Sequence, residues 1–134
     1  SEGAIIDGVG YFHGHAWPAP ELFQAREIVM GHNHPVIKFT DALGKKHLEQ
    51  AWIKARFSRS AILRHYGEKE ITWKNPRLTI MPAFNELAGG IPFNEAEYAE
   101  LLGPMFTSNA VNLDRADCYL LDGTYLGEIG SLRA

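Results

Sequence analysis

Hydrophobic residues of this chain occur in short runs that glycine, proline and charged residues interrupt, a pattern typical of strands. Three apolar runs are predicted to form strands: GVGYFHGH at residues 8–15, EIVM at 27–30 and LTIMPAF at 78–84. The hydrophobic pattern therefore predicts a domain built mainly around a sheet.

Two hairpins are also predicted. Residues 36–41 (VIKFTD) alternate between apolar and polar, ALGKK supplies a turn, and residues 47–57 return as the second strand. The second hairpin covers residues 118–133 and turns at Asp122 and Gly123, because Asp-Gly suits the positive φ angles of a tight hairpin turn.

Few helices are expected. Residues 20–25 (PELFQA) begin with proline and glutamate, which suit the first turn of a short helix. The clearest helix pattern of the chain covers residues 94–103 (NEAEYAELLG), with Asn94 as its cap and Gly103 as its end. Residues 58–67 fit either a short helix or an edge strand.

Composition limits the class of protein. The 134 residues suffice for one hydrophobic core, so we predict that residues 1–134 form a single unit. The apolar fraction of 46% and the charged fraction of 22% are ordinary for a globular protein. No apolar stretch reaches the roughly 20 residues of a membrane helix, and no secretion signal is recognisable. Cys118 is expected to be a buried small hydrophobe, and a cytoplasmic location without a membrane partner fits best.

The charge is unevenly distributed. The net charge is −3, but residues 44–77 contain nine Lys and Arg against three Glu, so this segment is about +6 and the remainder about −9. Such a basic segment is able to attract phosphate groups or a nucleic acid. The alternative is a solvated face whose charge the acidic remainder neutralises.

Four of the six histidines form two closely spaced pairs, His13 and His15 in GYFHGHAWP, and His32 and His34 in IVMGHNHP. Residues i and i+2 of a strand point to the same side, and each pair follows a predicted strand. Imidazole is a common ligand of zinc, manganese and iron, so we predict that at least His32 and His34 bind a metal. Structural, hydrogen-bonded histidines are the alternative. His47 is expected at the surface, and so is His65.

A cupin barrel is a competing interpretation, because cupins bind metal through H-x-H followed by a glutamate. Five residues separate His15 from Glu21 here, where a cupin has three or four, and prolines interrupt the strand that a cupin needs. The spacing therefore disfavours a cupin.

The order of a strand ending in H-G-H, a short helix and EIVMGHNHP resembles the carboxyl-terminal half of calcineurin-like metallophosphoesterases. GHNHPVIKFTD, PAFNELAGGIPFN and the final LLDGTYLGEIGSLR resemble the archaeal and bacterial branch related to ligase-associated DNA exonucleases and phosphoesterases. The resemblance covers nearly the whole chain. It implies an α/β fold, with this chain as the carboxyl-terminal half of a four-layer αββα sandwich, dominated by its sheet and with few helices.

The resemblance also implies a function. Family members hydrolyse phosphodiesters with two divalent ions held between the halves of the sandwich. By motif, His13 and His32 would bind the second ion and His34 the first, whereas His15 would serve catalysis by orienting its neighbours. Manganese is the expected metal, with zinc, iron and nickel as alternatives, and a nucleic acid is a candidate substrate. Asn85 in the PAFNELAGG loop is expected to line the cleft, unless this segment is an ordinary loop.

The chain also departs from the family pattern. Family members carry a D-x-H pair, a G-D with a bridging aspartate and a G-N-H-D/E motif upstream of H-G-H. Only twelve residues precede His13, and Asp7 is their only aspartate. We therefore expect the partner to be the amino-terminal half of the same domain, or a second copy of this chain in a homo-oligomer, and we expect the isolated chain to be inactive. A non-catalytic scaffold of the same fold is the second hypothesis, although the intact histidine motifs argue against it.

Overall fold

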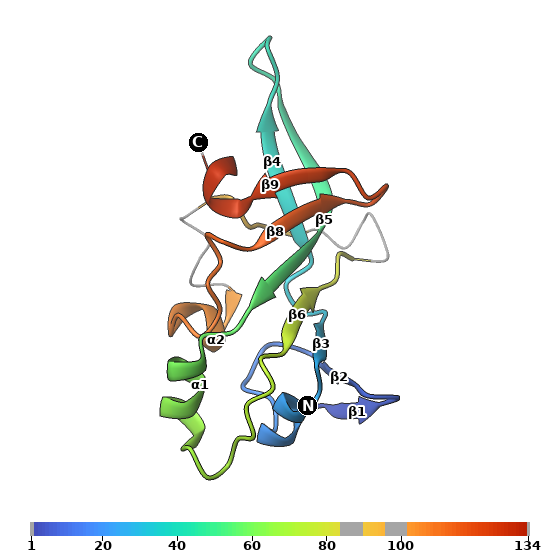
Figure 1. The fold of residues 1–134 in the computed structure, drawn as a ribbon. Helices are drawn as coiled ribbons and strands as arrows, with labels where there is room; N and C mark the ends of the chain where they lie inside the picture. The colour runs from blue at the N-terminus through green and yellow to red at the C-terminus, as the bar shows by residue number, and fades with distance from the viewer. Residues whose placement is uncertain (1, 84–89, 96–101, 134) are drawn as a thin grey trace.

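A curved mixed sheet with helices on one side forms the molecule (Figure 1). The computed structural model describes residues 2–83, 90–95 and 102–133. Within these residues the sheet has nine strands: β1 (Ala4–Ile6), β2 (Val9–Phe12), β3 (Glu27–Met30), β4 (Pro35–Thr40), β5 (Lys46–Arg56), β6 (Arg77–Ile80), β7 (Ile91–Pro92), β8 (Asp117–Leu120) and β9 (Tyr125–Glu128).

The strand order is β1-β2-β3-β6-β5-β4-β7, and β8 pairs with β5 and β9. β2, β3 and β6 run parallel to one another, and β4 is parallel to β7. The other pairs are antiparallel. The predicted sheet-dominated architecture with few helices is therefore confirmed, and this mixed sheet is compatible with the predicted α/β class.

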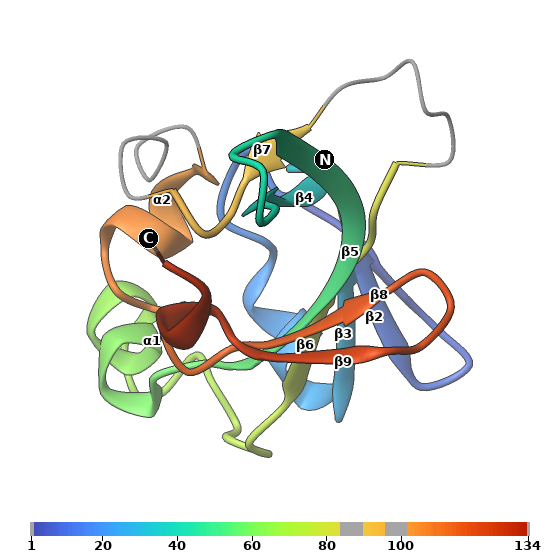
Figure 2. The ribbon, with the colours of Figure 1, turned by 90° about the horizontal axis from the view of Figure 1, so that it is seen from above.

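β5 is the longest strand and joins the two parts of the sheet. Its first half pairs with β4, and its second half pairs with both β6 and β8. Figure 2 shows β5 curving through the molecule from one part to the other. Ala51, Ile53 and Ala55 point into the core, whereas the alternating residues Lys54 and Arg56 point to solvent.

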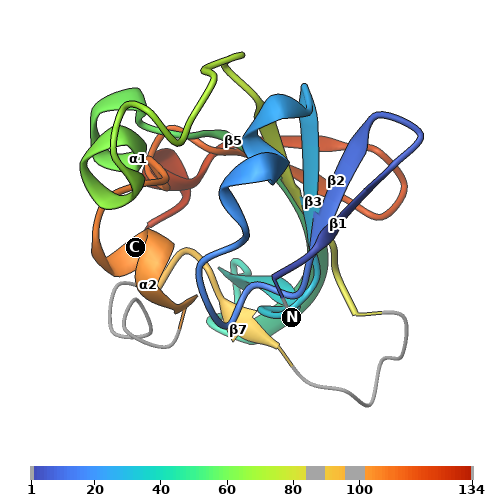
Figure 3. The same ribbon diagram turned by 90° about the horizontal axis from the view of Figure 1, so that it is seen from below.

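The helices lie on the same side of the sheet (Figure 3). They are η1 (Pro20–Gln24), α1 (Arg59–Tyr66), α2 (Pro104–Thr107) and η4 (Ile129–Leu132). Ser58 caps α1 by accepting a hydrogen bond from Ala61 N at 3.3 Å, and Gly67 follows the last residue of α1. Of the two structures that the sequence allows for residues 58–67, the chain adopts the helix, over Arg59–Tyr66.

The core lies between the sheet and these helices. Strand residues with no exposed surface, such as Ile28, Ile53 and Leu78, pack with Phe23 of η1. Cys118 of β8 is also fully buried, and burial raises the pKa of its thiol to about 11. The prediction that Cys118 is a buried small hydrophobe is confirmed.

The predicted strands and hairpins form, but several boundaries differ. β2 ends at Phe12 and β6 at Ile80, each earlier than predicted, because a turn follows Phe12 and Pro82 has no N–H to donate. Residues 129–132 form a 3₁₀-helix instead of continuing the last hairpin. β7, in a segment where no strand is predicted, extends the sheet beside β4.

The helix predicted over residues 94–103 falls largely outside the described residues, as does Asn85 with most of the PAFNELAGG loop. Asn94 is described and is 5% exposed. Its side-chain oxygen accepts a hydrogen bond from Lys38 N at 3.0 Å, and its Nδ2 donates to the carbonyls of Lys38 and Leu132. The Asn94 side chain therefore links β4 to η4.

Among the described residues, no helix has the length and apolar composition to span a membrane.

We expect Asn94→Ala to lower the free energy of unfolding by about 3 kcal/mol, because it removes three hydrogen bonds at a buried position. Urea denaturation measures the change. Asn112→Ala, at an exposed position, is the control and should stay within about 0.5 kcal/mol of the original protein. Equal stability of the two variants would contradict this role for Asn94.

Candidate metal centre

The parallel pairing of β2 and β3 brings the two histidine motifs together. Phe12 of β2 lies opposite Met30 of β3 at the last register position, so both strands end at the same edge of the sheet. The carbonyl of His13 then accepts hydrogen bonds from Gly31 N at 3.2 Å and from His32 N at 2.7 Å. These backbone contacts set the His13 and His32 side chains beside each other.

Three imidazole rings meet at this edge. His32 Nδ1 and His13 Nε2 lie 2.8 Å apart, close enough for one of them to donate a hydrogen bond to the other. The ring centroid of His15 lies 5.1 Å from that of His13 and 5.9 Å from that of His32. The structure therefore brings together His13, His15 and His32 from two separate motifs.

The environment of His32 favours its neutral form. His32 is half-buried, whereas His13 and His15 are exposed. Burial lowers the pKa of His32, and His13, His15 and His34 lower it further by charge repulsion. Neutral imidazole is the form that binds a metal.

Gly14 makes the close approach of the two motifs possible. Its φ of +118° is a conformation that residues with a side chain rarely adopt. A Cβ on Gly14 would lie 2.6 Å from Met30 Cγ and 3.0 Å from His32 Cβ. A glycine between His13 and His15 therefore lets the first motif fold over the end of β3.

His34 lies in a turn immediately before β4. Its φ is +47°, and its Nδ1 is buried without a hydrogen-bond partner in the described part of the chain. The neighbouring Asn33 donates from Nδ2 to the carbonyl of Leu102 at 2.9 Å, but its Oδ1 is likewise buried and unpaired among the described residues. Such buried polar atoms are uncommon, and an ion or a water is a common partner for them. Asn33 is not among the predicted site residues, because no spacing rule marks it.

The facing nitrogens of His13 and His32 fit a shared ion with a small shift. Two ligand nitrogens at about 2.1 Å from one ion stand roughly 3.0–3.4 Å apart, a few tenths of an ångström more than the 2.8 Å between Nε2 and Nδ1. Over residues 2–83, 90–95 and 102–133, however, no group of three or more His, Cys, Asp or Glu side chains is arranged to hold a metal. These residues offer two facing ligands, less than the four that zinc usually has.

The other two histidines lie elsewhere. His47 hydrogen-bonds Asp41 at 2.9 Å beside the β4–β5 turn, and this contact is the main reason why the pKa of Asp41 is lowered. His65 is exposed, as predicted, and stacks on Trp17 with ring centroids 3.6 Å apart. Residues 17 and 65 are far apart in sequence, so no local signal announces this stack.

Comparison of the chain with protein-family models, with curated proteins and with solved structures gives no match. The resemblance to metallophosphoesterases thus rests on the sequence motifs.

We expect Gly14→Ala to lower the free energy of unfolding by about 1–3 kcal/mol more than Gly44→Ala, because only the first introduces a clash with Met30 and His32. Gly44 is a matched control, since its φ is also positive, at +83°, and no atom within 4 Å would meet its Cβ. Chemical denaturation measures both variants. The His32 ring signals in NMR should move in Gly14→Ala alone, and similar losses in the two variants would count against the packing role of Gly14.

Proposed function

We propose that this chain supplies part of the metal centre of a metallophosphoesterase that hydrolyses phosphodiesters. The observation that carries the proposal is the 2.8 Å approach of His13 Nε2 and His32 Nδ1 at the ends of two adjacent parallel strands. Ligands commonly bind at the carboxyl ends of parallel strands, where loops from neighbouring strands converge. The motif resemblance supports the reaction class, and the chain is then the carboxyl-terminal half of an αββα sandwich.

Each histidine has a role in this proposal. His13 and His32 hold one divalent ion, and His34, whose buried Nδ1 is unpaired within the described residues, holds a second. A divalent ion at such a site polarises a phosphoryl oxygen and lowers the pKa of a bound water. His15, with its ring beside those of His13 and His32, keeps these rings oriented. Manganese is the proposed metal, with zinc, iron and nickel as alternatives that imidazole also binds.

The described histidines do not complete a two-ion site, and the proposal takes the further ligands from a partner. We propose that the partner is an amino-terminal half of the same domain, which contributes the carboxylates that hold both ions. A homo-oligomer is the alternative source of a second sheet.

Metal binding tests the ligands. We expect His13→Ala and His32→Ala each to weaken binding of Zn²⁺ or Mn²⁺ at least tenfold, because each removes one of the two facing nitrogens. Isothermal titration calorimetry measures the affinities, and Zn²⁺ should bind more tightly than Mn²⁺. His47→Ala, outside the cluster, is the control and should bind like the unsubstituted protein. If all three variants bind alike, the proposed ligands are wrong.

Hydrolysis tests the completeness of the site. We expect the chain with Mn²⁺ to hydrolyse an aryl phosphodiester no faster than Mn²⁺ alone, because no carboxylate of the described residues completes a three-ligand group with the histidines. Release of the phenolate is followed by absorbance. Robust turnover that His32→Ala abolishes would show a complete site and overturn this expectation.

A non-catalytic scaffold is the second candidate function, and the absence of a three-ligand group among the described residues favours it. Exposed apolar side chains on β1 and β2, such as Ile5, Ile6 and Tyr11, would then contact a partner. A scaffold predicts that neither Mn²⁺ nor Zn²⁺ binds at the histidines, so the same calorimetry separates the two functions.

A further inference from the structure

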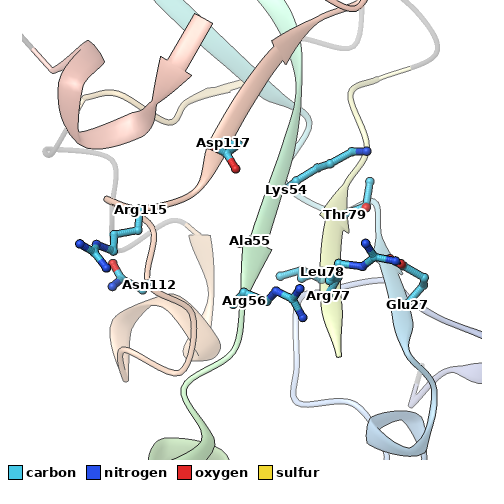
Figure 4. Close-up of a pocket in the computed structure, with 10 residues that line it drawn as sticks. All are labelled: Glu27, Lys54, Ala55, Arg56, Arg77, Leu78, Thr79, Asn112, Arg115 and Asp117. Carbon is cyan, nitrogen blue, oxygen red and sulfur yellow. The ribbon is translucent and has the colours of Figure 1, made fainter. Parts of the chain in front are cut away.

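A basic hollow of about 630 Å³ lies on the outer face of β5 and β6, opposite the core (Figure 4). Because Ala55 and Leu78 point inward, the residues on either side of them in β5 and β6 point outward. The charged residues that line the hollow are four cations and two acids: Lys54, Arg56, Arg77, Arg115, Glu27 and Asp117. The lining therefore carries an excess of two positive charges.

The register of β5 and β6 places like charges together. Arg56 lies directly opposite Arg77 in the antiparallel pair, an arrangement that is unfavourable without a counter-charge. Figure 4 shows the Arg56 side chain reaching from β5 towards β6. Glu27 forms an ion pair with Arg77, but Arg56 donates only to a carbonyl oxygen, that of Asn75, at 2.8 Å. The charge of Arg56 therefore has no matching anion in the described residues.

Two further cations of the hollow, Lys54 and Arg115, also lack an ion pair among the described residues. Lys54 lies opposite Asp117 in β8, but no ion pair joins them within the described residues. Asp117 instead accepts a hydrogen bond from the Tyr125 hydroxyl at 2.8 Å. Arg115 is exposed and likewise has no ion pair in the described part of the chain. An anion from outside the chain would neutralise the charges of Lys54 and Arg115.

Aromatic rings border the hollow on both sides. One adjoining depression shares Arg56 and Arg77 and adds Arg26, Lys74 and Trp73 among its lining residues. Another shares Lys54 and Thr79, and is lined by Trp52 and Tyr119, which lie opposite each other on β5 and β8. The Lys54 Nζ lies 5.6 Å from the centroid of the Tyr119 ring, so cation and ring are immediate neighbours.

We propose that this outer face of β6, β5 and β8 binds single-stranded nucleic acid. Its phosphates contact Lys54, Arg56 and Arg115, and its bases stack on Trp52 or Tyr119. Rows of cations beside aromatic platforms are the usual means of holding a single strand, because every base has a face that stacks. A duplex keeps its bases stacked inside and offers only its phosphates.

The Glu27–Arg77 end of this surface lies away from the histidine cluster. Glu27 and Arg77 begin β3 and β6, whereas His32 follows the other end of β3. Five residues of extended chain between Glu27 and His32 correspond to about 16 Å. The binding proposal thus does not depend on the metal centre, and it is tested with EDTA present.

The test measures fluorescence anisotropy of a labelled DNA single strand of about 16 nucleotides at several salt concentrations. We expect Lys54→Gln/Arg115→Gln to weaken binding at least tenfold at low salt. The slope of log affinity against log salt should become less negative by about 1.4, because two phosphate contacts are lost. Lys45→Gln/Lys46→Gln removes the same charge at the far β4–β5 turn and is the control, which should keep the original slope.

Trp52→Leu separates stacking from charge. It should weaken binding at least fivefold and leave the salt slope unchanged, because it removes a ring and no cation. Circular dichroism melting checks that each variant is folded. If Trp52→Leu is not folded, Tyr119→Leu takes its place as the stacking variant. The proposal fails if a duplex of the same length binds as tightly as the single strand. It also fails if the control variant loses as much affinity as Lys54→Gln/Arg115→Gln, or if the single strand does not bind.

Discussion

The parallel register of β2 and β3 is the constraint on which the histidine cluster depends. Once Phe12 lies opposite Met30, the carbonyl of His13 receives the N–H groups of Gly31 and His32, and the two rings have to meet. A shift of one residue would turn the alternating side chains of a strand to the opposite face and remove both Ile28 and Met30 from the core. The buried face of the sheet thus determines which atoms meet at its edge.

The same alternation of side chains determines which residues lie on the outer face of the sheet. Ile53 and Ala55 anchor β5 in the core, and this inward set obliges Trp52, Lys54 and Arg56 to face outward. A strand that packs well on one side therefore displays a fixed row of rings and cations on the other. The histidine cluster and the basic hollow lie at opposite ends of the parallel strands, so one sheet holds two groups of polar residues without direct contact between them.

Local signals in the sequence predict local features of this protein well. Asp122 and Gly123 mark the last hairpin, and the H-x-H spacing marks the rings of His13 and His15 as neighbours. The pairing of strands that are far apart in sequence could not be predicted in this way. No local pattern says that β6 lies between β3 and β5, or that Arg56 faces Arg77, because these registers depend on packing of the whole core. Asn94 shows the same limit, since no local pattern indicates that its side chain hydrogen-bonds residues as distant as Lys38 and Leu132.

The position of β5 also bears on how the chain reaches its folded state. Ala51 pairs with Leu120, and Glu27 of β3 pairs with Arg77, so the centre of the sheet consists of contacts between residues far apart in sequence. Closing such long loops costs chain entropy before the contacts stabilise anything. The β4–β5 hairpin is local and able to form early, whereas Cys118 reaches its buried place only when β8 docks. The burial of that thiol consequently reports the docking of β8, and its protection from alkylation during refolding would time that step.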